Sequence, residues 1–270
     1  RVRPGDKQYR VRATEYLVNR LKDEDAFVRA AAARALAALP PAPEITMPIW
    51  EKAFQDSDAT TVQYALDAMA AMGAPAVPRL VDSLKHENVR RQVIYILGQI
   101  GPDAAPATPA LVALIGDKDE RIAREAVLAL AKIGPGAKAA VPSLVAALEQ
   151  GDNPNAGPII YALGRIGPDA AAAEPVLTGL LGDSNQKLAV ASGWALVQIH
   201  PSEEVAAKAV PVLTAGLKNE MPLARCGAAE ALGNLGSFAK SAAPALKKAT
   251  EDPDKAVSET ATKALQAVAK

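Results

Sequence analysis

Few residues in this 270-residue sequence could carry catalysis. Only two histidines occur; we expect His86 in a solvated turn and His200 as a helix C-cap that interacts with the helix dipole. The single cysteine, Cys226, follows Arg225, a charge that would lower a thiol pKa, but we favour a small residue filling a tight position. No serine or cysteine has a recognisable base partner, and no glycine-rich phosphate loop is present. We therefore predict a protein that is not an enzyme and has no cofactor.

Pairs of aspartates recur along the chain and could suggest calcium sites. They are Asp23/Asp25, Asp56/Asp58, Asp117/Asp119 and Asp252/Asp254. Each pair lacks the dense ligand spacing and the glycine of a calcium-binding loop. The second aspartate of a pair lies three residues before an apolar helical stretch, where its carboxylate can accept hydrogen bonds from free N–H groups. The pairs therefore predict helix N-caps and no metal site.

One pattern does indicate a binding surface. Tyr95, Leu128, Tyr161 and Trp194 follow one another at intervals of 33 residues. Basic residues lie four positions before or after members of this column: Arg91, Arg124, Lys132 and Arg165. Aromatic anchors surrounded by arginine are typical of protein-binding hot spots, and the cations would favour an acidic partner. The aromatic side chains could equally be structural and cover gaps between adjacent helices.

The elements that position this column come from a sequence repeat. Gly101-Pro, Gly134-Pro and Gly167-Pro are 33 residues apart, and each follows an isoleucine that ends an apolar run. Residues such as Ile159, Leu163 and Ile166 form one stripe of an amphipathic helix. Glycine then ends this second helix of the repeat, and a proline opens the first helix of the next one, from Pro48 to Pro244. A fixed period of this size indicates a solenoid.

Eight helix–turn–helix repeats, without any strand pattern, account for the chain as a single solenoid over residues 1–270. We place the repeats near residues 10–39, 44–72, 75–100, 105–133, 138–166, 171–199, 204–235 and 240–268.

These repeats resemble HEAT repeats, and more closely the short HEAT-like repeats of phycobilisome lyases. The resemblance rests on Val141-Pro-Ser-Leu-Val-Ala-Ala-Leu148, an acidic turn, and a second helix that ends Ala-Leu-Gly-Arg-Ile-Gly-Pro168. It implies an all-α, right-handed α-α superhelix of the HEAT/armadillo type, with second helices on the concave surface. It also implies a binding scaffold. Bilin lyases and HEAT-like DNA glycosylases are catalytic relatives, but no specific residue carries over from either.

Composition limits the partners further. The chain has 30 basic and 30 acidic residues, and this neutral balance argues against general nucleic-acid or membrane binding. No apolar run approaches the ~20 residues that span a bilayer. The sequence begins at Arg1 without methionine, so we expect a removed signal or a segment of a larger protein, and the compartment is left open. We predict a monomer or such a segment that binds a protein or peptide; the alternative is a bilin-lyase-like subunit that holds a tetrapyrrole against an acceptor protein.

Overall fold

A computed structural model describes residues 7–37 and 59–270, and every regular element within these ranges is helical. The prediction of an all-α repeat solenoid is therefore confirmed. The expected first helix of the second repeat, with Pro48, Trp50 and Phe54, lies outside the described residues, as do Asp56 and Asp58. Over the described ranges, no helix is both long enough and apolar enough to cross a membrane. The chain divides into two compact units, Arg1–Leu111 and Val112–Lys270.

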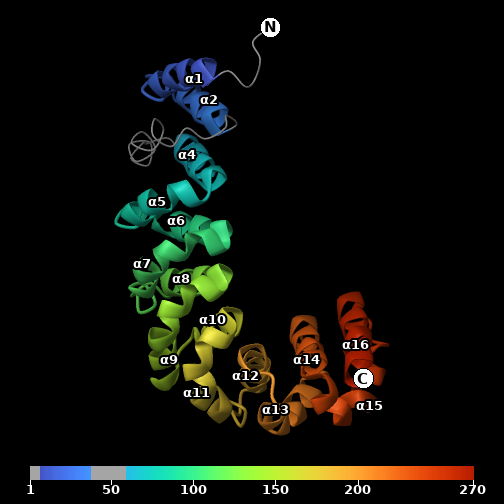
Figure 1. Cartoon of the computed structure of the whole chain (residues 1–270). Coiled ribbons are helices and arrows are strands. Elements are labelled where there is room, and N and C mark those ends of the chain that lie inside the picture. Colours follow the sequence, from blue (N-terminus) through green and yellow to red (C-terminus); the bar gives the residue numbers. More distant parts are fainter. Residues whose placement is uncertain (1–6, 38–58) are drawn as a thin grey trace. The chain divides into compact units, whose positions relative to one another are not determined.

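Unit 1 contains antiparallel helix pairs and short 3-10 segments (Figure 1). Its elements are α1 (Lys7–Arg20), α2 (Ala26–Ala37), α4 (Ala59–Met72), η1 (Ala74–Ala76), α5 (Val77–Ser83), α6 (Glu87–Ile100) and η2 (Gly101–Ala107), and α7 (Thr108–Val112) lies at its boundary. Helix α2 packs against both α1 and α4, and α6 packs against α4 and α5.

Unit 2 contains the longer, regular part of the array. Its elements are α8 (Glu120–Ile133), η3 (Gly134–Ala140), α9 (Val141–Glu149), α10 (Ala156–Ile166), η4 (Gly167–Ala173), α11 (Glu174–Leu180), α12 (Gln186–Ile199), α13 (Glu203–Gly216), α14 (Pro222–Leu235), η5 (Gly236–Ala242), α15 (Ala243–Ala249) and α16 (Lys255–Val268). The second helices α8, α10, α12, α14 and α16 pack against one another in that order. Within this unit, Figure 1 shows α10, α12, α14 and α16 on the inner side of the bend and the first helices on the outer side.

The predicted apolar stripe forms the core of unit 2. Ile159, Leu163 and Ile166 of α10 are completely buried, and so are Leu130 and Ile133 of α8. Full burial of one such side chain stabilises the fold by about 1.5–3 kcal/mol relative to exposure. The stripe therefore holds the second helices together and leaves their opposite face open for other roles.

The acidic turns begin the second helices as the sequence predicts. In α8 the Asp119 carboxylate accepts from the Arg121 amide at 2.9 Å, and Asp117 accepts from the Asp119 amide at the same distance. The hydrogen bond from the Arg121 amide lowers the pKa of Asp119. Asp252 and Asp254 repeat this arrangement at α16. The capping interpretation is confirmed, because these carboxylates are engaged by backbone N–H groups.

The second helices end at glycines with positive φ. Gly134 has φ 67° and ψ −134°, a region that side chains rarely allow, and a 3-10 segment follows at once. His200 ends α12 as the predicted C-cap, with an extended backbone in place of the glycine conformation, and its Nδ1 lies 3.6 Å from Glu174 Oε1. His86 forms the N-cap of α6 and is half-buried, so the expectation of a solvated turn is only partly met.

One predicted helix start is wrong. Pro211 does not open the first helix of the seventh repeat but lies inside α13, which begins at Glu203. The Ser202 hydroxyl accepts from the Val205 amide at 3.2 Å and caps this earlier start. The three additional residues of this repeat and the Ser202 cap extend the helix upstream, where the other repeats of unit 2 have a 3-10 segment.

We expect Ser192→Ala to stabilise the protein. Ser192 lies on the buried stripe of α12, is fully buried, and its hydroxyl has no hydrogen-bond partner among the described residues. An unsatisfied buried hydroxyl costs about 1–3 kcal/mol, so its removal should raise Tm by roughly 2–4 °C or more in thermal melts. Ser258→Ala is the control, since that hydroxyl donates to the Lys255 carbonyl. A lower Tm for Ser192→Ala than for the parent would contradict this assignment.

Candidate partner-binding surface

The predicted column in unit 2 comes from one register position on successive second helices. Leu128 lies on α8, Tyr161 on α10 and Trp194 on α12, and the next equivalent residue is Glu230 on α14. Each of these positions is opposite the buried stripe of its helix; Tyr161 is exposed, whereas Leu128 and Trp194 are half-buried. Tyr95 and Arg91 occupy exposed positions on α6, which belongs to unit 1. Their continuity with the unit 2 column stays a prediction.

Tyr161 and Trp194 form the centre of the surface. Their ring centroids are 5.5 Å apart and their planes differ by 18°, which is a stacked arrangement between adjacent helices. Tyr161 remains 44% exposed, whereas Trp194 is half-buried. Stacked pairs of this type contribute about 0.5–1.5 kcal/mol beyond their buried area. The two rings therefore form a fixed aromatic platform with an open side at Tyr161.

The absence of a side chain at Gly164 makes room for Trp194. A Cβ on Gly164 would overlap Trp194 Cζ3 and lie 3.0 Å from both Cε3 and Cη2. Gly227 of α14 lies at the other side of the ring, where a Cβ would be 3.9 Å from Trp194 Cδ1. The indole thus occupies the space between α10 and α14 against two glycine positions.

A polar contact completes the placement of Trp194. Its Nε1–H donates to Glu230 Oε2 at 3.4 Å, across 36 residues of sequence. The ring is therefore held by Tyr161, Gly164 and Glu230 together. A side chain held in this way loses little conformational entropy when a ligand binds, which favours affinity.

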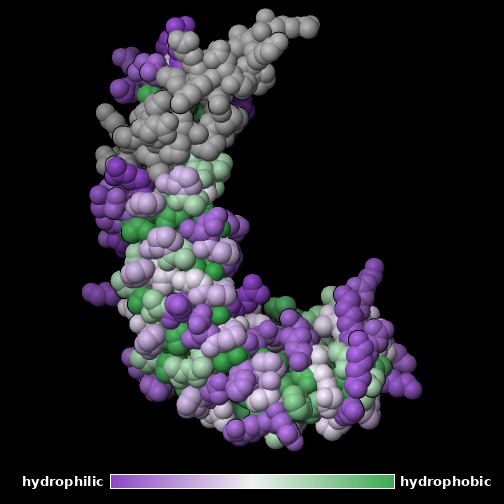
Figure 2. All heavy atoms as spheres, viewed as in Figure 1, coloured by the Kyte–Doolittle hydropathy of each residue, from purple (hydrophilic) through white to green (hydrophobic). Residues whose placement is uncertain are grey.

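The predicted basic residues of unit 2 lie one turn before or after the column position on α8 and α10. Arg124 and Lys132 on α8 and Arg165 on α10 are all exposed. A Cβ at Gly134 would lie 3.5 Å from the Arg165 carbonyl oxygen, so α8 and α10 end side by side. Lys132 and Arg165 lie in the last turns of their helices, where a cation also interacts favourably with the helix dipole. Figure 2 shows hydrophilic and hydrophobic side chains interspersed over the visible face of unit 2.

Two residues of the surface were not singled out from the sequence. Gly164 carries no functional group, and glycine recurs at this register position as Gly98 and Gly233 in repeats without a following tryptophan, whereas the adjacent repeats hold Ala131 and Val197. The residue type therefore does not mark Gly164 as the support of Trp194. Glu230 stood at the column position, but its contact with the indole depends on the side-chain direction of Trp194. The sequence signal that could have indicated the contact of Gly164 with Trp194 is their spacing, since they lie 30 residues apart in a 33-residue repeat.

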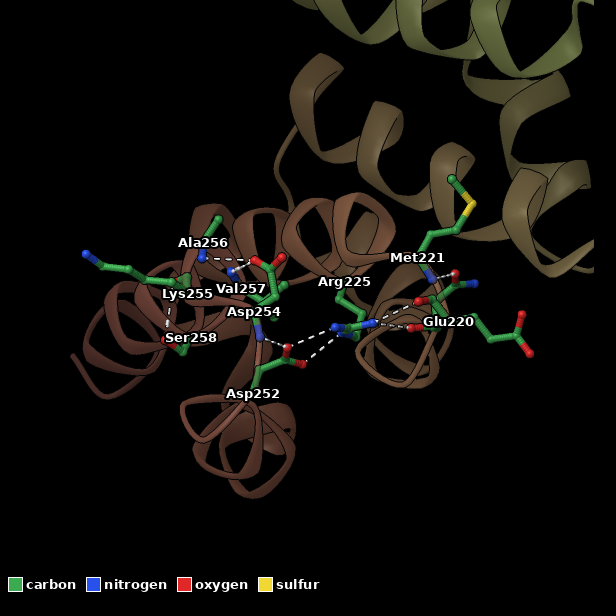
Figure 3. A network of polar contacts seen from close by, with 10 residues as sticks. Glu220, Met221, Arg225, Asp252, Asp254, Lys255, Ala256, Val257 and Ser258 are labelled. Atoms are coloured by element: carbon green, nitrogen blue, oxygen red, sulfur yellow. Dashed lines mark hydrogen bonds and ion pairs between the residues drawn. The ribbon is translucent and has the colours of Figure 1, made fainter.

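A second polar cluster, at the turns of the last two repeats, is structural (Figure 3). Arg225 donates from Nε and Nη2 to the two Asp252 oxygens, each at 2.8 Å, and from Nη1 to the Asn219 and Glu220 carbonyls. The Arg225 and Asp252 side chains are only 13% and 10% exposed. This pair joins α14 to the turn before α16. Beside it, burial raises the pKa of Cys226 and outweighs the lowering effect of the Arg225 charge.

The Arg225–Asp252 pair predicts a pH-dependent stability. The hydrogen bonds from Arg225 hold the pKa of Asp252 below its usual range, so this carboxylate stabilises the fold above its unfolded pKa of about 4 and loses that effect as pH falls through the lower folded pKa. Asp252→Asn should lower Tm at pH 7, and the difference from the parent should shrink below about pH 4. The exposed Asp169→Asn is the control. An equal difference at pH 7 and in acid would contradict the prediction.

Comparisons with known proteins agree with this architecture. The family described as HEAT repeats matches residues 77–164 and 173–266, and a further HEAT repeat matches residues 13–39. The structure is similar to the complex of CpcE and CpcF of phycocyanin lyase from Nostoc sp. PCC7120, with 19% identity, a TM-score of 0.52, and 85% of this chain and 95% of that chain covered. It is also similar to the X-ray structure of YibA from Escherichia coli, with 17% identity, a TM-score of 0.54, and 98% and 99% covered.

These two structures share less than a fifth of their residues with the chain, so they show the fold alone. No curated protein sequence matches the chain. The family matches cover more than half of the residues and confirm the resemblance inferred from the repeat pattern. The chain belongs to the HEAT repeat family.

Proposed function

We propose that this protein is a non-catalytic scaffold that binds a peptide or protein segment across the second-helix face of unit 2. HEAT repeats generally mediate protein interactions. The observation that supports a location for this role is the Tyr161–Trp194 stack, which is fixed by Gly164 and Glu230 yet leaves Tyr161 open. Rigid aromatic anchors of this kind dominate the energy of many interfaces.

The charges around the stack favour an acidic partner. Arg124 and Arg165 are exposed, and neither forms an ion pair with a described residue. Their guanidinium groups can therefore bind carboxylates of a partner in bidentate geometry. Surface charges of one sign steer oppositely charged partners and add specificity, whereas the aromatic pair contributes most of the affinity.

The second candidate is a subunit that holds a tetrapyrrole against an acceptor protein. Its support is the similarity to the phycocyanin lyase complex, together with an aromatic surface whose arginines could bind propionates. Addition of a bilin to the purified chain separates the two functions. A shift in bilin absorbance that disappears in the Tyr161→Ala/Trp194→Ala variant would favour the tetrapyrrole, and an unchanged spectrum would favour the peptide.

Affinity capture from the native organism's lysate tests the scaffold function. The parent chain is compared with a Tyr95→Ala/Tyr161→Ala/Trp194→Ala variant that keeps the parent's helical circular dichroism at the temperature of the capture. Tyr16→Ala is the matched control, because Tyr16 is an exposed tyrosine on α1 outside the column. Proteins lost only from the triple variant would support the function, and equal recovery by all three chains would contradict it.

A further inference from the structure

Charge changes sign along the second-helix face of unit 2. Three positions of each second helix define this face: the column residue and the residues four before and four after it. At these positions α8 carries Arg124 and Lys132, and α10 carries Arg165. Helix α12 carries no charge there, and α14 carries the anion Glu230. Because α8, α10, α12 and α14 pack in this order, the face passes from cationic through aromatic to anionic within one unit.

The anionic end is not neutralised by the described part of the chain. Glu230 is exposed and accepts a hydrogen bond from the indole N–H of Trp194 at 3.4 Å, a neutral donor. Lys263 occupies the next column position on α16, but no ion pair joins it to Glu230. The change in charge ends at α14, because α16 presents both an anion, Glu259, and a cation, Lys263. Glu230 therefore leaves a carboxylate open beside the aromatic pair.

We propose that the partner segment is bipolar. Its carboxylates lie over α8 and α10, an apolar or aromatic side chain packs on Tyr161 and Trp194, and a basic side chain pairs with Glu230. This inference rests on the proposed function and adds a fixed direction to it, because the reversed segment would place like charges together at both ends. Juxtaposed like charges repel, which disfavours the reversed orientation.

The length of such a segment follows from helix packing. Adjacent helices lie about 8–10 Å apart, so three steps from α8 to α14 span about 24–30 Å. An extended chain rises about 3.3 Å per residue and covers this span with about seven to nine residues, whereas a helix needs about 16–20. A displayed library of random peptides of about 20 residues contains both forms.

Selection from this library on the parent chain tests the proposal. We expect enriched peptides in which acidic residues and a basic residue flank an apolar or aromatic residue. The Arg165→Glu/Glu230→Arg variant should bind these peptides about tenfold or more weakly and should itself select the opposite charge order. Glu204→Lys/Lys208→Glu is the control, because it reverses an exposed ion pair of 2.8 Å on the first helix α13.

The outcomes separate the two proposals. One outcome would overturn the bipolar partner and leave the proposed function standing. In that outcome the selected peptides contain no basic residue, bind the Glu230→Arg variant as they bind the parent, and lose binding to the Tyr161→Ala/Trp194→Ala variant. If the parent enriches peptides no more than the Tyr161→Ala/Trp194→Ala variant does, the bipolar partner and the proposed function are both overturned. Reversed charge preference in the swapped variant, with no change in the α13 control, establishes the direction.

Discussion

The Gly164→Ala variant is expected to unfold at a lower temperature than the parent and to lose the Tyr161–Trp194 stack. The new Cβ would overlap the Trp194 ring, so the indole has to leave the space between α10 and α14. Insertion of a methyl group into a filled site costs about 1–3 kcal/mol. The loss of stability arises here even though alanine favours a helix more than glycine does.

Thermal melts and tryptophan fluorescence measure this effect. A Trp50→Phe background leaves Trp194 as the sole tryptophan, and its emission should shift to longer wavelength as the ring becomes exposed. Gly179→Ala is the matched control, since this glycine of α11 has no atom within 4 Å of a Cβ. It should gain about 0.5–1 kcal/mol from helix propensity. A Gly164→Ala variant with the stability and emission of its parent would show that Trp194 is not held against α10.

The second expected result is a large loss of affinity when the aromatic pair is removed. Tyr161→Ala/Trp194→Ala should weaken partner binding by about a hundredfold or more, because each hot-spot aromatic typically contributes at least about 2 kcal/mol. Titration calorimetry with a captured partner measures the change without relying on tryptophan signals. Tyr16→Ala should bind as the parent does. A change of less than about threefold in a folded double variant would assign both rings to packing alone.

The helical architecture was predictable because its signals are local. A glycine such as Gly134 ends a helix through its own φ, and an aspartate such as Asp119 caps one through bonds two residues away. Periodic burial, as at Ile159 and Leu163, needs only the spacing of apolar residues. These effects act within one repeat, and the period then multiplies them along the chain.

Other features depend on contacts between repeats and could not be predicted in this way. The position of Pro211 was misjudged because the Ser202 cap starts α13 upstream of it. The pKa of Cys226 rises through burial, which outweighs the charge of the adjacent Arg225. The column residues Tyr161 and Trp194 were identified from their period. Their stacking depends on Gly164, which lies on the same helix as Tyr161 and is close to Trp194 only in the folded structure.

Hydroxyl-radical footprinting of the chain with and without a captured partner tests whether the partner covers the Tyr161–Trp194 stack. It measures the reactivity of unaltered side chains, so it does not depend on whether a variant folds. We expect Tyr161 and Trp194 to become protected in the complex, while Tyr16, also an exposed tyrosine, reacts as in the free chain. A bound partner that leaves Tyr161 as reactive as before would place the interface elsewhere on the molecule.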